Sequence, residues 1–467
     1  MAVNQDVIVD IDLLKKYDKP GPRYTSYPTA PHFHDGFGAE EYREELLLSN
    51  SSKNVPDLSL YFHFPFCDSL CLYCGCNVVI TRKPEKIDEY VEYLKKEISM
   101  VAEFLPGDGS REVRQFQWGG GTPTYLSADQ IRYIMEHIHH HFEFADDIEA
   151  GVEIDPRELT RDRLVALRET GFNRASMGVQ DFDPKVQETV NRIQPEALTI
   201  RHFNTLKELG FGSLNIDLIY GLPFQSPESF SYTIEKIIEI DPDRIALFNY
   251  AHVPWLKRHQ TYFKPEWLPS PETKLQILKL AIDRFTSAGY VFIGMDHFAK
   301  PDDELTIAQQ ERNLYRNFQG YSTRAGLDLY ALGVTSISQT QDVYAQNVKT
   351  LPAYYERIDS DTLPVFKGYR LTRDDHIRRW VITRLMCDFE LHPNEVESEF
   401  GISFEDYFSE ELDGLVEFED DELLTFENDV IKVNPLGRLL IRNIAMTFDK
   451  YLREPKTEKS PTYSRTV

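Results

Sequence analysis

The chain has 467 residues, of which 41% are hydrophobic and 12% aromatic, so it can bury a large core and carry a second, smaller domain. Its formal net charge of -25 argues against nucleic acid as a partner, because nucleic-acid binding depends on basic surfaces. No apolar run is long enough to span a bilayer and no secretory signal opens the sequence, so we expect a cytoplasmic protein.

Short apolar runs alternate with amphipathic stretches from Leu58 onward, a pattern typical of βα units and a parallel sheet. The predicted strands cover residues 58–64, 114–118, 148–154, 173–179, 213–219 and 244–249, and residues 290–294 form a further candidate. The predicted helices cover residues 85–104, 127–142, 160–169, 196–209 and 227–240. Six such units predict an α/β fold with a partial TIM-type (βα)6 barrel rather than a closed barrel of eight units.

The composition changes along the chain and predicts four parts. We expect residues 1–54 to form an N-terminal extension and residues 55–357 to form the barrel and its extension. Residues 358–454 form a smaller, mainly α-helical domain with a β-hairpin, whose acidity disfavours DNA binding. Residues 455–467 form a polar tail that we expect to be mobile.

Polar residues gather where the predicted strands end. They are Tyr61, Gly119–Gly121, Glu153 with Asp155, Gln180 with Asp181, Asp217, and Asn249 with His252. A single carboxylate in such a place could be a helix cap or a surface residue. Barrel enzymes place their chemistry at the carboxyl ends of the strands, so six consecutive cases predict an active site there.

Four of the five cysteines, Cys67, Cys71, Cys74 and Cys76, lie within ten residues and predict a metal site. Three thiolates on an iron-sulfur cubane leave one iron open to a substrate or cofactor. The sequence does not decide whether Cys76 is a ligand. A zinc knuckle that uses all four thiolates is the alternative. The fifth cysteine, Cys387, stands alone in an apolar stretch and is expected in the core.

The CxxxCxxC loop with Tyr73 before its third cysteine resembles the signature of the radical S-adenosylmethionine (SAM) enzymes. More narrowly, the chain resembles the oxygen-independent coproporphyrinogen III oxidase family over nearly its whole length. This resemblance rests on Gly-Pro-Arg-Tyr-Thr-Ser-Tyr-Pro at residues 21–28, on Cys76, on Trp-Gly-Gly-Gly-Thr-Pro-Thr at 118–124 and on Gly-Met-Asp-His-Phe-Ala at 294–299.

The resemblance implies a [4Fe-4S] cluster held by Cys67, Cys71 and Cys74, and two molecules of SAM. It places Tyr61, Gly120 and Glu153 around the first SAM. The residues that it places around the second are Tyr73, Gly121, Thr122, Gln180, Arg192, Asp217, Ala251 and Ile337. From the residue type alone, Arg192 could equally form a surface ion pair.

The activity implied by the resemblance is oxidative decarboxylation of two propionates of coproporphyrinogen III to vinyl groups. Tyr61, Glu153 and Arg23 are the candidate catalytic residues. The resemblance also implies that the extension of residues 1–54 lies over the active site. Tyr24 and Tyr27 could close over the tetrapyrrole with Arg23, or the segment could be a packed structural strand. We also expect a low-potential electron donor such as flavodoxin or ferredoxin, a monomer, and no membrane span.

Two other functions remain open from the sequence. One is a radical SAM-like haem-trafficking protein, and the other is a non-catalytic Fe-S or zinc binding module. The predicted substrate carries four carboxylates, whereas the chain is itself strongly acidic, so the two would repel each other. A site for this substrate must therefore gather arginines locally.

Overall fold

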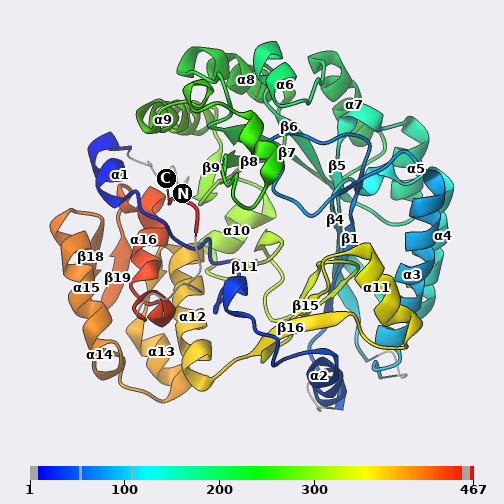
Figure 1. The fold of residues 1–467 in the computed structure, drawn as a ribbon. Helices are drawn as coiled ribbons and strands as arrows, with labels where there is room; N and C mark the ends of the chain where they lie inside the picture. The colour runs from blue at the N-terminus through cyan, green and yellow to red at the C-terminus, as the bar shows by residue number, and fades with distance from the viewer. Residues whose placement is uncertain (1–8, 52–54, 107–109, 455–462, 467) are drawn as a thin grey trace. The chain divides into compact units, whose positions relative to one another are not determined.

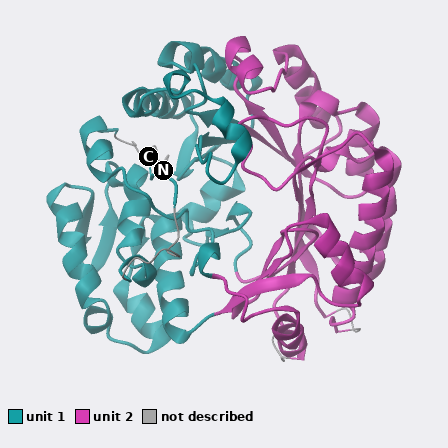
Figure 2. Cartoon of the chain, in the orientation of Figure 1, with its two compact units in different colours: residues 1–32, 218–325, 371–467 teal, residues 33–217, 326–370 magenta. Residues whose placement is uncertain are grey.

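The computed structural model describes residues 9–51, 55–106, 110–454 and 463–466. The chain forms two compact units, which Figure 2 shows in different colours. Unit 1 contains residues 1–32, 218–325 and 371–467, and unit 2 contains residues 33–217 and 326–370. Both units join segments that are distant in the sequence, and the divisions predicted at residues 54, 357 and 454 stay predictions.

Unit 2 contains most of the parallel sheet (Figure 1). Its strands are β1 (Leu58–Phe64), β4 (Val113–Gly120), β5 (Phe144–Ile154), β6 (Arg174–Gln180), β13 (Asp328–Leu332), β14 (Ile337–Gln339), β15 (Val343–Asn347) and β16 (Val365–Arg370). The order is β16-β15-β14-β13-β1-β4-β5-β6. Strands β13, β1, β4, β5 and β6 pair in parallel, and β14 to β16 add an antiparallel edge.

The helices of unit 2 alternate with these strands. They are α2 (Ala39–Ser51), α3 (Pro84–Ala102), α4 (Ala128–His141), α5 (Arg161–Glu169), α6 (Pro184–Thr189), α7 (Glu196–Glu208) and α11 (Leu351–Asp359), with the short 3-10 helices η2 (Pro123–Tyr125) and η3 (Pro156–Glu158). Local sequence explains their starts: Ser127 and Gln130 form a reciprocal capping box at α4, and Thr160 caps α5.

The core of unit 2 is aromatic. Phe62 packs against Phe116 with ring centroids 5.4 Å apart, and Phe64 packs against Trp118 at 4.7 Å. All four side chains are buried. Because these residues alternate along β1 and β4, the residues between them are left for the opposite face of the sheet.

Strand β7 (Ser213–Tyr220) runs from unit 2 into unit 1, and β8 (Arg244–Asn249), β9 (Val291–Gly294) and β10 (His297–Ala299) lie in unit 1. The remaining helices of this part are α1 (Ile11–Tyr17), α8 (Pro227–Ile240), α9 (Pro271–Ser287) and α10 (Glu304–Gln310), with η1 (Ala30–His32), η4 (Arg258–Tyr262) and η5 (Pro265–Trp267). A separate hairpin joins β11 (Tyr315–Asn317) to β12 (Gly320–Ser322).

The C-terminal part of unit 1 is mainly helical, as predicted. Its helices are α12 (Arg373–Asp388), α13 (Pro393–Phe400), α14 (Phe404–Tyr407), α15 (Ser409–Asp420), α16 (Ile441–Met446), η6 (Gly437–Leu440) and η7 (Lys450–Leu452). The predicted hairpin is β18 (Leu424–Glu427) with β19 (Val430–Val433), and β17 (Glu390–Leu391) extends it to three strands. Cys387 is fully buried beside Ile293 and Leu314, which confirms its place in the core.

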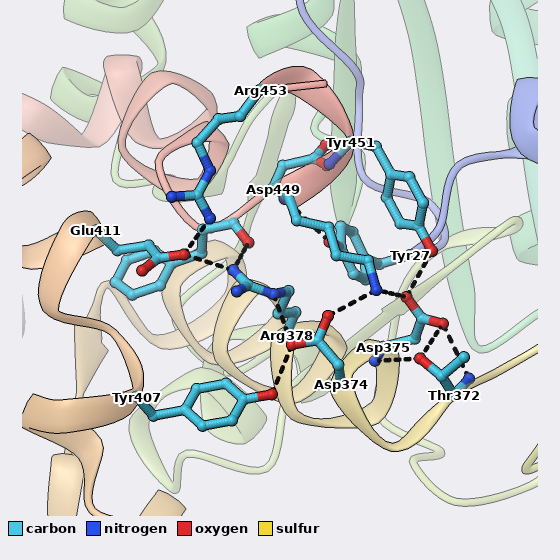
Figure 3. A network of polar contacts seen from close by, with 12 residues as sticks. Tyr27, Thr372, Asp374, Asp375, Arg378, Tyr407, Glu411, Asp449, Tyr451 and Arg453 are labelled. Atoms are coloured by element: carbon cyan, nitrogen blue, oxygen red, sulfur yellow. Dashed lines mark hydrogen bonds and ion pairs between the residues drawn. The ribbon is translucent and has the colours of Figure 1, made fainter. Parts of the chain in front are cut away.

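A polar network ties the N-terminal segment to this C-terminal part (Figure 3). The Tyr24 hydroxyl donates to Asp449 at 2.9 Å, and the Lys450 amide donates to the Tyr27 hydroxyl at 3.2 Å. Around α12, Arg378 contacts both Asp374 and Glu411, at 2.9 and 2.7 Å. Tyr24 and Tyr27 are both buried, so within unit 1 this segment is a packed structural element.

The described end of the chain is also paired. Arg465 forms a β-bridge with Pro20, the Gly21 amide donates to Ser464 O at 3.0 Å, and the Thr466 amide donates to Lys19 O at 2.8 Å. The backbone groups of residues 463–466 therefore have partners within unit 1, and the mobility of the tail stays a prediction. Residues 455–462 and 467 lie outside the described residues. Within the described ranges, no helix has both the length and the apolar character needed to cross a membrane.

Candidate active site

The cysteine loop follows β1 in unit 2. Two short strands, β2 (Phe66–Cys67) and β3 (Val79–Ile80), pair in parallel and bring the two ends of the loop together. Cys71 is buried, Cys67 and Cys74 are half-buried, and Cys76 is exposed. The Cys74 amide donates to Cys71 O at 3.0 Å, so the second and third cysteines share one tight turn.

The thiols lie close to one another. Burial raises the pKa of the Cys67 thiol to about 11, with smaller contributions from Cys74 and Cys71, while a contact of 3.3 Å to the Thr122 hydroxyl opposes the shift. Among the described residues, no three His, Cys, Asp or Glu side chains converge where one ion could be held. A cubane does not need three ligands on one ion, because each thiolate binds a different iron and one iron stays open.

Two arginines surround the sulfur of Cys71. Arg157 Nη2 lies 3.4 Å and Arg192 Nη1 lies 3.6 Å from its Sγ. Asp155 accepts from both arginines, at 2.7 and 2.9 Å; burial raises the pKa of this carboxyl, but Arg192 and Arg157 outweigh burial and lower it to about 2. Positive charge beside a thiol favours the thiolate that binds iron. Arg192 is only 6% exposed and is therefore not the surface ion pair considered from the sequence.

The glycine loop at the end of β4 leaves no room for side chains. A Cβ on Gly119 would lie 2.9 Å from Glu153 Oε1, and a Cβ on Gly120, whose φ is +114°, would lie 2.7 Å from the His63 ring. A Cβ on Gly121 would lie 2.7 Å from the backbone of Pro65. The loop is thus packed against the residues around the cysteine loop, which only glycine permits.

Tyr61, His63 and Glu153 stand beside this loop. The Tyr61 hydroxyl lies 3.2 Å from His63 Nδ1, and His63 Nε2 lies 3.2 Å from Asn77 O. Burial lowers the pKa of His63 to about 4, so the ring is neutral and donates from Nε2 while Nδ1 accepts from Tyr61. Glu153 accepts from the Gly120 amide at 3.0 Å, and burial raises its pKa to about 7.

Asp217 on β7 is, like Glu153, a buried carboxyl with a raised pKa. Its carboxylate accepts from Ser176 at 2.9 Å and from Asn215 at 2.7 Å, and burial raises its pKa to about 6. Gln180 ends β6 with a positive φ of 69°, and its buried Oε1 has no hydrogen-bond partner in the described part of the chain. A buried acceptor without a partner is costly, so this atom fits a donor supplied by a bound molecule.

The other predicted residues of unit 2 lie near these groups in the sheet or along the chain. Tyr73 lies between Cys71 and Cys74 in the loop, and the charges of Arg192 and of both cysteines act on it. Ile337 begins β14, where the next residue, Ser338, accepts from the Ala331 amide at 2.9 Å; Ala331 in turn pairs with Tyr61.

Arg23 and Ala251 belong to unit 1. Ala251 follows β8 and is exposed, and its carbonyl accepts from Gln260 at 3.3 Å. Arg23 forms an ion pair with Asp296, and its side chain is 34% exposed.

Sequence reasoning missed Arg157, Ser176 and Asn215. The second and third are polar residues in the middle of largely buried strands, and they point to the same face as Asp217. That alternation was a usable signal. Arg157 gave none, because an arginine after Asp155-Pro156 is an ordinary loop residue until the fold brings it to Cys71.

The donor set fits a cluster with SAM. Unit 2 provides three neighbouring thiols, a glycine loop with no side-chain bulk, buried carboxyls that can accept from amino or hydroxyl groups, and an arginine that can face a carboxylate.

Comparison with known proteins agrees with this geometry. Residues 61–237 match the radical SAM superfamily, and residues 371–440 match the HemN C-terminal domain. The chain is 46% identical to "Oxygen-independent coproporphyrinogen III oxidase" of Synechocystis sp. over 98% of this chain and 97% of the relative. It is 47% identical to the protein of that name from Escherichia coli, over 96% and 97%.

A solved structure of coproporphyrinogen III oxidase (HemN) from Escherichia coli, described as a radical SAM enzyme, superposes with a TM-score of 0.90. It is 46% identical in sequence, and the match covers 96% of this chain and all of that one. Identity at this level over nearly the full length confirms the predicted family and fold class and sets aside the zinc knuckle. The chain belongs to the oxygen-independent coproporphyrinogen III oxidase family of radical SAM enzymes.

Proposed function

We propose that the protein decarboxylates two propionate side chains of coproporphyrinogen III to vinyl groups without oxygen, giving protoporphyrinogen IX in haem biosynthesis. Each propionate gives up a hydrogen atom from its β-carbon, carbon dioxide and one electron. The observation that carries this proposal is the near full-length match to relatives that all have this name.

Cys67, Cys71 and Cys74 are the proposed ligands of a [4Fe-4S] cluster. Cluster and SAM together supply, when bound, the one-electron chemistry that removes an unactivated hydrogen. The Arg157 and Arg192 guanidiniums lie 3.4 and 3.6 Å from the Cys71 sulfur and place positive charge beside this ligand, and the buried aromatic residues near β1 keep water away. Cys76 is not a ligand in this proposal, because it is the exposed member of the four.

Tyr61, Gly120 and Glu153 are proposed to bind one SAM. Glu153 has a pKa near 7 and already holds the Gly120 amide, so its second oxygen can accept from an amino group while the carboxyl is ionised. Tyr73, Gly121, Thr122, Gln180, Arg192, Asp217, Ala251 and Ile337 are the proposed residues for a second SAM. The neutral His63 fixes the Tyr61 hydroxyl through Nδ1.

The remaining parts of the proposal concern partners. A low-potential donor such as flavodoxin or ferredoxin would supply electrons, and the enzyme would act as a cytoplasmic monomer. Arg23 is proposed to contact the substrate, since its guanidinium is partly exposed and carboxylates are its natural partners.

An anaerobic assay tests the proposal. The reconstituted protein is incubated with SAM, a reductant and coproporphyrinogen III, and porphyrin products and 5'-deoxyadenosine are followed together. Protoporphyrinogen with matched deoxyadenosine is the expected result. Deoxyadenosine without decarboxylation, from protein with an intact cluster, would contradict it and favour the haem-trafficking alternative.

A further inference from the structure

Three arginines of unit 1, Arg23, Arg316 and Arg442, converge on residues 21–23; we call them the arginine cluster. Arg316 on β11 donates from Nε to Arg23 O at 3.4 Å. Arg442 on α16 donates to Pro22 O at 3.0 Å and also to Gly21 O. The backbone before and at Arg23 is therefore held by two other guanidinium groups.

The arginine cluster contains three guanidinium groups but only one ion pair to a carboxylate among the described residues. Arg23 has Asp296, but within the described ranges neither Arg316 nor Arg442 forms an ion pair. Among the described residues, Arg442 donates only to backbone carbonyls, and the Arg316 Nη1 atom is buried without a hydrogen-bond partner. Their exposed fractions are 6% and 5%. Buried, uncompensated charges are costly unless an anion joins them, and burial and Arg316 together lower the pKa of Arg442 to about 10.

Further groups without partners adjoin Arg316. His297 Nδ1 and Gln319 Nε2 are buried and unbonded. Burial, Arg316 and Arg23 lower the pKa of His297 to about 3, so the ring is neutral. Gly320, next to Gln319, is near His297, because a Cβ there would lie 3.9 Å from its Nε2.

Aromatic rings complete the surroundings. The Arg316 guanidinium lies 4.7 Å from the Tyr321 ring centre, and that of Arg23 lies 5.9 Å from Phe248. The His297 ring packs edge-on against both rings, at 5.3 and 5.9 Å. The arginine cluster thus combines guanidinium groups, which can donate two hydrogen bonds to a carboxylate, with aromatic rings that can pack against the apolar part of the molecule bearing that carboxylate.

We infer that the arginine cluster, with Arg316 as its central contact, binds a carboxylate side chain of the substrate tetrapyrrole. This assignment rests on the proposed function and adds where the substrate is held. The carboxylate first meets the guanidinium of Arg23, which is partly exposed and paired with Asp296. It then binds the buried Arg316 of the arginine cluster. The cluster provides the local positive charge that a carboxylate-rich substrate needs from an acidic chain.

Binding of coproporphyrin III to the full-length, cluster-loaded but unreduced protein, measured by porphyrin fluorescence, tests this assignment. Its tetramethyl ester has the same ring system without charged carboxylates and serves as the matched ligand. We expect the wild type to prefer the free acid. Arg316→Gln should weaken binding of the free acid by at least 10-fold, leave the ester unchanged, and leave SAM affinity and the cluster spectrum unchanged.

Arg312→Gln is the control variant, because Arg312 pairs with Glu395 and does not belong to the arginine cluster. This variant should bind the free acid like the wild type. If Arg316→Gln does not fold, Arg23→Gln, in a partly exposed position, must show the same selective loss. Unchanged binding of the free acid by Arg316→Gln and Arg23→Gln would overturn the assignment. Loss of SAM affinity would also overturn it, since the carboxylate would then be that of SAM. A wild type that neither binds nor converts the tetrapyrrole would contradict the proposed function itself.

Discussion

The two units differ in the polar groups that they bury at the proposed binding sites. Unit 2 places Glu153 and Asp217 beside its glycine loop and strands, and burial raises the pKa values of both carboxyls, to about 7 and 6. Unit 1 buries Arg316 and Arg442, and neither forms an ion pair with the described residues. A set of acceptors suits the amino and hydroxyl groups of a cofactor, and a set of guanidiniums suits the carboxylates of a substrate. Local placement therefore decides what binds, and the net charge of -25 does not.

The largest expected effect concerns the cluster in unit 2. Cys71→Ser should abolish both iron binding and turnover, because it removes a buried sulfur ligand that lies beside two guanidiniums. Cys76→Ser is the control and should keep the cluster, since Cys76 is exposed. Iron and sulfide content with the visible spectrum measure this. Equal loss of iron from both variants would make Cys76 a fourth ligand and break the assignment.

The glycine loop gives the next effect. Gly119→Ala should weaken SAM binding by roughly 10- to 100-fold, since a Cβ would push Glu153 and Tyr61 from their positions by steric overlap. Gly75→Ala, in the cysteine loop, should have no effect because nothing lies within 4 Å of its Cβ position. Equilibrium binding of SAM to the unreduced protein compares them. Identical affinities would show that Glu153 and Tyr61 do not contact SAM.

The raised carboxyl pKa values make the stability of the unliganded protein depend on pH. Burial raises the pKa of Glu97 to about 7 from its ordinary 4.5, so the folded state holds this proton more tightly than the unfolded state. Stability contributed by the protonated group is present below about pH 4.5 and is lost as the pH rises to 7, by about 3 kcal/mol at most. Glu153 acts in the same direction.

Thermal unfolding between pH 5 and 7.5 measures this effect. The wild type should lose stability as the pH rises, and Glu97→Gln should show a shallower decline. Glu97 is 2% exposed and accepts from Tyr354, Asn347 and the Gly333 amide, so a flat profile in the wild type would mean that these donors already hold the ionised form.

The smallest effect concerns the support of Arg23 in unit 1. Tyr24→Phe removes the hydroxyl that donates to Asp449 and should cost about 1 kcal/mol of unfolding free energy. KM for the substrate should rise modestly while kcat stays the same, because Arg23 loses an anchor and not a contact. Tyr133→Phe, at a site 46% exposed, should be close to neutral. Equal effects of the two substitutions would show that the segment is not held at Tyr24.

Strands and helices of both units were predictable from local patterns. The strand predicted at residues 58–64 and the one at 244–249 match β1 and β8, and helix 227–240 matches α8. Apolar alternation and helix caps are local signals, so they survive without tertiary information. The parallel strand β13 and the antiparallel strands β14 to β16 were missed, because each is only three to six residues long and lacks a pattern of its own.

The sequence by itself determined the family, the cysteine loop, the glycine loop and the polar ends of the strands, because these features depend on residues close together in the chain. The tertiary structure alone decided which charges meet. Arg157 joins Cys71 across 86 residues, Arg316 joins Arg23 across 293, and Arg442 joins Pro22 across 420. No periodicity or motif links such residues; their approach and their lack of acid partners follow only from how the core packs and which groups it removes from water.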